Sequence, residues 1–225
     1  MIVPLADGED AWRALLADLS ALSEDDEIIL AASEGAPMLP LPAPGLRACV
    51  RQTREGRGRA RQMNAGARAA RGEFLWFLHA DSRLAAATTL ALLRTATEHP
   101  DHLLYADLVF ARDATPLMRL NQAGAWIRSR LLGLPFGDQG LCLSKSAFDD
   151  LGGYPEDASY GEDHLLVWRA RRSGRKLQPI RAPLLTSARK YRTGGWLSTT
   201  RLHFARTLVQ AWPQWRKSLA TWGAR

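Results

Sequence analysis

Short continuous apolar runs alternate along the chain with segments in which apolar residues recur at helical spacing. The runs "MIVPL" (1–5), "DEIILAA" (26–32), "LRACVRQ" (46–52), "EFLWFL" (73–78) and "HLLYADLVF" (102–110) predict strands. Helices are predicted between them, over about 9–22, over 58–72 and over about 85–98. Strands that alternate with helices indicate an α/β domain with a largely parallel sheet.

The strand over 73–78 is apolar throughout, which is typical of a strand buried on both faces. It runs directly into His79-Ala80-Asp81, and ligands of such sheets bind beyond the carboxyl ends of the strands. Asp81 could hold a divalent cation that bridges to a diphosphate. It could equally cap the next helix, and spacing alone leaves both interpretations open. His79 could ligate the metal, contact a ribose or be structural.

The predicted helix over 58–72 has two distinct faces. Its small apolar face can lie close against the sheet and consists of Ala60, Met63, Ala67 and Ala70. A flanking polar stripe consists of Arg57, Arg61, Asn64 and Arg68. Arginines and backbone N–H groups near a helix N-terminus favour a phosphate or a nucleotide, although a solvated basic face has the same pattern.

Two further segments place polar side chains where a ligand could reach them. Asp138 and Gln139 lie between glycines in a tight loop, and a helix capped by Ser144 or Ser146 follows. Glu162 and Asp163 then open another helix. The helix dipole favours the ionised carboxylate, which lowers its basicity but leaves it ready to accept a proton from a hydroxyl. Simple capping of the helix by these two residues is the alternative.

Charge is divided unevenly along a chain of ordinary globular composition. The net charge is +7, but residues 164–225 contain fourteen Lys and Arg and no acidic residue. Such a segment implies an anionic partner: phosphate, nucleic acid or a lipid surface. From about residue 195 it interleaves tryptophan with basic residues, which suits either a membrane interface or a helix packed on the domain. Nucleic acid is disfavoured, because the predicted rim is acidic and no nucleic-acid motif is present.

Four blocks together resemble the family 2 glycosyltransferases of GT-A fold, and more narrowly the bacterial subfamily associated with radical-SAM and selenoprotein-domain proteins. They read "GRARQMNAGARAARGEFLWFLHADSRL", "FGDQGLCLSKSAFDDLGGYP", "GEDHLLVWRARRSGRKL" and "TSARKYRTGGW", and span most of residues 56–196. The resemblance implies a Rossmann-like, mainly parallel sheet flanked by helices. It also implies one domain over residues 1–225, with a helical C-terminal extension over about 195–225.

The resemblance implies a role for each candidate residue. Asp81, in an Asp-x-Asp position that begins with His79, would coordinate Mg²⁺ or Mn²⁺ on the diphosphate, and His203 is a candidate for a further metal ligand. Asp163 would be the catalytic base, with Glu162 as the alternative, while Asp138 and Gln139 would line the donor sugar or the acceptor. The donor-binding set would be Pro4, Glu34, Arg57, Arg61, Asn64, His79, Arg189, Lys190 and Arg192.

The expected function is therefore inverting transfer from a nucleoside-diphosphate sugar to an unknown acceptor, which could be lipid-linked. We expect a cytoplasmic enzyme that binds no nucleic acid and makes peripheral contact with an anionic membrane. The N-terminal half departs from the family pattern, with "PLADGED" and "AASEGAP" where members read like Pro-x-x-Asn-Glu and Asp-Gly-Gly-Ser-x-Asp. This departure motivates an alternative, a non-catalytic sugar-nucleotide-binding or scaffold protein.

Overall fold

The computed structural model describes residues 1–39, 45–110, 117–158, 160–187 and 195–201, and then 205, 207, 209 and 211–214. Four predicted site residues lie outside the described residues: Arg189, Lys190, Arg192 and His203. In the described part, no helix is long and apolar enough to cross a membrane.

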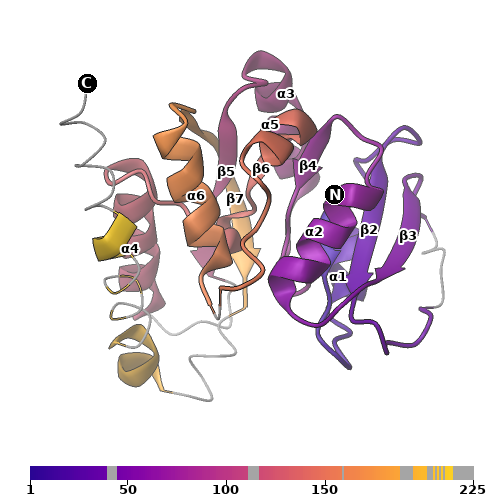
Figure 1. Cartoon of the computed structure of the whole chain (residues 1–225), viewed down its shortest axis with the longest axis horizontal. Coiled ribbons are helices and arrows are strands. Elements are labelled where there is room, and N and C mark those ends of the chain that lie inside the picture. Colours follow the sequence, from indigo (N-terminus) through magenta and orange to yellow (C-terminus); the bar gives the residue numbers. More distant parts are fainter. Residues whose placement is uncertain are drawn as a thin grey trace.

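In the described part of the chain, seven strands form a mixed sheet that consists of two parts. One part has the order β1-β2-β3 and is parallel, with β1 at Ile2–Pro4, β2 at Glu27–Ala32 and β3 at Cys49–Arg54. The other part has the order β4-β6-β5-β7, with β4 at Phe74–Trp76, β6 at Cys142–Ser144, β5 at Leu103–Phe110 and β7 at Leu177–Thr186. Ile2 pairs in parallel with Phe77, which joins the two parts edge to edge (Figure 1). Only β6 runs antiparallel to its neighbours among these strands, so the expectation of a mainly parallel sheet is confirmed.

Helices cover both faces of the sheet, because its central strands are buried on both sides. Alternate residues of β2 enter two separate cores: Leu30 lies in one and Ile29 in the other. The first core includes α1 (Trp12–Asp18) and α3 (Ala86–Glu98). The second includes α2 (Arg59–Ala69), α5 (Lys145–Asp150) and α6 (Glu162–Arg172). Helix α4 (Met118–Arg130) packs beside β5, where the Tyr105 hydroxyl donates to the Ser129 carbonyl oxygen at 3.1 Å.

Helix α2 lies unusually close to the sheet, as its small apolar face predicts. A Cβ atom on Gly66 would come within 2.6 Å of the Ile2 Cγ2 atom, and Ile2 is fully buried and has no room to move. This close approach fixes the N-terminus of α2 at the carboxyl edge of β1 and β4. Arg59 is the first residue of α2, and its side chain reaches from there to His79, after β4, and to Asp163.

We predict that the two helical glycines of the described chain respond in opposite directions to alanine. Gly66→Ala should lower the free energy of unfolding by about 1–3 kcal/mol, because the new methyl group overlaps Ile2. Gly124→Ala in α4 meets no atom within 4 Å and should raise it by about 0.5–1 kcal/mol through helix propensity. Urea denaturation measures both, and a Gly66→Ala protein as stable as Gly124→Ala would contradict the close packing of α2.

Candidate active site

Arg59 connects the three segments that form the site. Its Nη2 atom donates a hydrogen bond to Oδ2 of Asp163 at 2.9 Å, and its Nε atom lies 3.5 Å from Oε1 of Glu162. The same Nη2 atom contacts Nε2 of His79. One guanidinium therefore ties the start of α2 to the end of the β4 segment and to the first turn of α6.

Asp163 is buried, and its Oδ1 atom has no hydrogen-bond partner among the residues that the structure describes. Burial raises the pKa of this carboxyl to about 6, against the opposing effect of Arg59, and the nearby Glu162 and Asp138 raise it further. The sequence-based expectation that the helix N-terminus lowers its basicity is wrong. Desolvation and two neighbouring carboxylates outweigh the dipole of α6.

The backbone of a short 3₁₀ turn, η1 (Gly137–Gln139), closes on Asp163. A Cβ atom on Gly137 would lie 2.1 Å from Oδ2 of Asp163, so no other residue fits here without moving the carboxylate. Gln139 holds the turn from within: it is 1% exposed, donates to the Ala106 carbonyl oxygen at 2.9 Å and accepts from Arg128 at 3.2 Å. Its contact with a sugar stays a prediction.

Two more polar groups face the same cluster. Oδ1 of Asp138 makes no hydrogen bond within the described chain and lies 4.0 Å from Nη2 of Arg128. The hydroxyl of Tyr154 is buried and likewise lacks a hydrogen bond to any described residue. Burial, and next the charge of Asp163, raise the pKa of Tyr154, which therefore remains a neutral hydroxyl beside the carboxylates. Unsatisfied buried polar groups gathered in one place mark this cluster as the candidate functional site.

Asp81 lies half-buried at the turn after β4 and makes no hydrogen bond or ion pair within the part of the chain that the structure describes. Helix α3 begins after Ala85 without a side-chain cap, so the interpretation of Asp81 as a helix cap is wrong.

The interpretation of Glu162 or Asp163 as the cap of α6 is wrong too, since α6 follows Gly161 and has no side-chain cap. No group of three His, Cys, Asp or Glu that could hold a metal exists among the described residues. A lone free carboxylate suits a cation bound largely by phosphate oxygens of a substrate.

The other predicted site residues differ in their exposure and in the contacts that they make. Arg61 is exposed and pairs with Glu156 at 3.6 Å. Asn64 clamps the segment after α5: its amide donates to the Tyr154 carbonyl oxygen and to Glu156, and its Oδ1 atom accepts from the Tyr154 N–H, each at 2.9 Å. Pro4 ends β1, while Glu34 and Arg57 are exposed in the loops after β2 and before α2. Their contacts with a nucleotide stay predictions.

Sequence reasoning missed Arg59, the residue that organises the site. The helical pattern predicts Arg57 and Arg61, on either side of Arg59, as the residues near a phosphate. The spacing of residues does not indicate which arginine at the start of an Arg-rich helix turns inward. The available signal was Gly58, whose φ of 107° lets the chain turn sharply into α2. It also missed that Asp7, after β1, accepts a hydrogen bond from the Ser33 hydroxyl, after β2.

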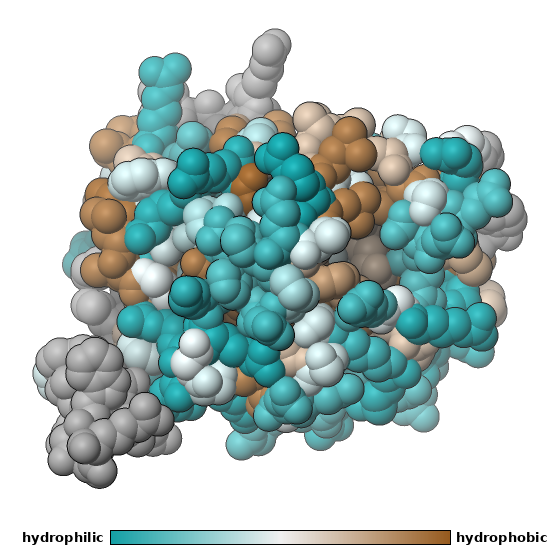
Figure 2. Space-filling model, turned by 90° about the horizontal axis from the view of Figure 1, so that it is seen from above, coloured by the Kyte–Doolittle hydropathy of each residue, from teal (hydrophilic) through white to brown (hydrophobic). Residues whose placement is uncertain are grey.

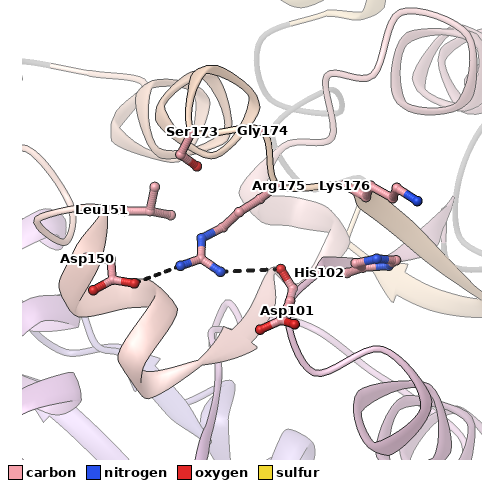
Figure 3. A pocket seen from close by; sticks show the side chains of 8 residues that line it. All are labelled: Asp101, His102, Asp150, Leu151, Ser173, Gly174, Arg175 and Lys176. Carbon is pink, nitrogen blue, oxygen red and sulfur yellow. Dashed lines mark hydrogen bonds and ion pairs between the residues drawn. The ribbon is translucent and has the colours of Figure 1, made fainter.

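A separate hollow of about 490 Å³ lies at the opposite edge of the sheet, before β5 and β7 (Figure 3). There Arg175 bridges Asp150, at 2.8 Å, and the carbonyl oxygen of Asp101, at 3.4 Å. The hollow therefore lies far from Asp163 and takes no part in the site.

Comparisons with known proteins agree with this arrangement. Residues 2–151 match the family model described as glycosyl transferase family 2. A crystal structure of S. aureus TarS 1–349 with UDP-GlcNAc is similar to the chain, with a TM-score of 0.63 and 17% identity over 83% of this chain and 57% of that one. A mannosyltransferase of Pyrobaculum calidifontis with GDP-Man and Mn²⁺ has a TM-score of 0.61 and 15% identity over 82% and 55%.

The chain thus spans little more than half the length of these solved structures, and the likeness shows the GT-A fold. A search of curated proteins finds no match.

We predict that Asp163 makes the folded protein less stable at neutral pH. Its pKa is raised from 3.8 to about 6, so stability is lost as the pH rises through this window and the buried group ionises. Asp163→Asn should therefore gain stability over the wild type, by about 1 kcal/mol more at pH 8 than at pH 5. Denaturant titration at both pH values measures this. Asp150→Asn, with a side chain 69% exposed, is the control and should show no such gain.

Proposed function

Because the chain belongs to glycosyl transferase family 2, we propose that it transfers a sugar from a nucleoside-diphosphate sugar to an acceptor hydroxyl, with inversion at the anomeric carbon. The observation that carries the proposal is Asp163: a buried carboxylate with a pKa of about 6 and one oxygen without a hydrogen bond to any described residue. A pKa slightly below neutral leaves such a group ionised and yet basic enough to take a proton.

In the proposed reaction, Oδ1 of Asp163 accepts the proton of the acceptor hydroxyl while that oxygen attacks the anomeric carbon. The bond from this carbon to the diphosphate breaks, and the diphosphate leaves with the electron pair. Arg59 holds Oδ2 in place, and its positive charge keeps Asp163 ionised against the repulsion of Glu162 and Asp138. Gly137 excludes water from one side of the carboxylate by direct contact.

Asp81 would hold Mg²⁺ or Mn²⁺, which neutralises charge on a departing diphosphate. The fit rests on its free, half-buried carboxylate at the end of the β4 segment, two residues from His79. The Mn²⁺ in the mannosyltransferase structure supports this choice of cation for a protein of the same fold. The similar structures contain UDP-GlcNAc and GDP-Man, which supports a nucleoside-diphosphate sugar as donor here without choosing the base.

The proposal further places the enzyme in the cytoplasm, with an acceptor that a lipid could carry. A non-catalytic sugar-nucleotide-binding or scaffold protein is the second candidate, favoured by one observation: the segments "PLADGED" and "AASEGAP", which start at the ends of β1 and β2, depart from the family pattern. Any turnover that depends on Asp163 excludes this candidate. Nucleotide binding without turnover across a panel of donors would support it.

We predict that Asp163→Asn lowers turnover by about 10²–10⁴-fold, because the variant cannot accept the proton. Donor affinity should change little, since Asp163 faces the acceptor. Release of nucleoside diphosphate measures the first quantity and titration calorimetry with the donor measures the second. Asp150→Asn should leave both unchanged. An equal loss of turnover and of donor affinity in Asp163→Asn would remove its role as base.

We also predict that one nucleoside diphosphate stabilises the protein and that this effect requires Asp81. Thermal shifts with UDP, GDP, ADP and CDP, each with and without Mn²⁺, should reveal one base that raises the Tm by roughly 5–10 °C near saturation. The shift should vanish without Mn²⁺ and in Asp81→Ala but persist in Asp150→Ala. A metal-independent shift that survives in Asp81→Ala would show that Asp81 does not hold the cation.

A further inference from the structure

Helix α4 turns its larger apolar residues towards solvent. Its inward face is narrow and consists of Met118, Ala125 and Ser129. The exposed fractions of the apolar residues on and around the outward face range from 46% to 69%: Leu117, Leu120, Trp126, Ile127, Leu131 and Leu132. This is the reverse of an ordinary surface helix, whose apolar stripe faces the core.

The exposed residues form a continuous stripe with a basic border. Leu120, Ile127 and Leu131 follow one another at spacings of seven and four, which places them on one side of the helix. Arg119, which is exposed, lies along one border of that side. The stretch 117–137 contains no acidic residue at all.

The C-terminal segment extends this surface. Trp196 donates a hydrogen bond to Oδ1 of Asn121 in α4 at 2.8 Å, and Asn121 donates to the Thr200 hydroxyl at 3.1 Å. Described residues of the segment add three further exposed apolar side chains, at 60–63% exposure: Leu197, Val209 and Trp212. Figure 1 shows helical pieces of this segment beside α4, and Figure 2 shows brown, apolar atoms gathered along the same side of the molecule. We call α4, Leu131, Leu132 and these three residues the α4 surface.

We propose that the α4 surface docks on the anionic headgroup surface of a membrane. Leucine, isoleucine and tryptophan beside arginine are the composition of helices that lie in this interface. The charge selects the partner: residues 164–225 contain no acidic residue, and within them Arg171 donates to the Leu132 carbonyl oxygen at 2.8 Å and Arg172 to Gln214 at 2.7 Å. Each Lys or Arg near an anionic leaflet contributes about 1 kcal/mol of attraction. A second copy of the chain would bring two such cationic segments together, which disfavours self-association through this surface.

The α4 surface lies directly behind the turn that contacts Asp163. Arg128 of α4 stacks over the Phe136 ring at 3.5 Å, and donates to the Leu134 carbonyl oxygen at 3.0 Å and to Gln139 at 3.2 Å. A membrane under α4 would therefore place an acceptor carried by a lipid next to η1. This last step rests on the proposed transferase function, whereas docking itself does not.

Co-sedimentation of the full chain with vesicles tests the docking, in the absence of any nucleotide. We expect binding to vesicles of equal parts phosphatidylcholine and phosphatidylglycerol at low salt, and little binding to pure phosphatidylcholine or at high salt. The double variant Leu120→Gln/Leu131→Gln should bind about tenfold or more weakly, because both side chains leave the apolar interface.

The matched control is Leu90→Gln/Leu93→Gln, which removes two leucines, 58% and 39% exposed, from a different helix, α3. This variant should bind as the wild type does. Equal binding by the α4 variant and the wild type would overturn the proposal. So would absence of wild-type binding, or a wild-type dimer in sedimentation velocity that the α4 variant dissociates. Unaltered thermal shifts with nucleotide check that the variant is folded, and vesicle binding without sugar transfer would refute only the transferase function.

Discussion

The salt-bridged cluster of Arg59, Asp163 and Glu162 is the constraint on which the rest of the site depends. Two carboxylates buried side by side, with Asp138 close by, would not both stay ionised without a cation between them. Arg59 supplies that cation and holds Oδ2 of Asp163 by a hydrogen bond. Oδ1 of Asp163 has no hydrogen-bond partner among the described residues. The balance leaves the pKa of Asp163 at about 6, which suits the proposed role of this carboxylate as a base and lowers folding stability at neutral pH.

The fold meets this constraint by close backbone approaches. Gly66 allows α2 to lie against Ile2, which brings Arg59 to the edge of the sheet. Gly137 allows η1 to close on the carboxylate from the other side. Asn64, one turn after Arg59, ties α2 to the Tyr154 segment that leads into α6. Small residues and one amide therefore set the geometry of the charged groups.

The sequence was sufficient to predict the strands β1 to β5, the edge that carries His79 and Asp81, and the cap of α5, where Ser144 accepts from the Ala147 N–H at 3.3 Å. It was insufficient for β6, which has three residues in a glycine-rich stretch, and for β7, whose prolines at 179 and 183 are tolerated because the strand lies at the edge of its part of the sheet. Arg59 and the basicity of Asp163 depend on contacts between α2, η1 and α6, which no local pattern encodes.

Helix α4 was also missed, and the reason bears on its role. The polar contacts that hold it come from its inner side: Arg130 pairs with both oxygens of Asp107 at 2.8 Å, and Ser129 accepts from Tyr105. Its leucines contribute little to this packing because they face outward. An apolar face that the fold does not use is costly to leave in water, since it invites aggregation. The proposed docking would cover this face with the membrane, beside the turn that holds Asp163.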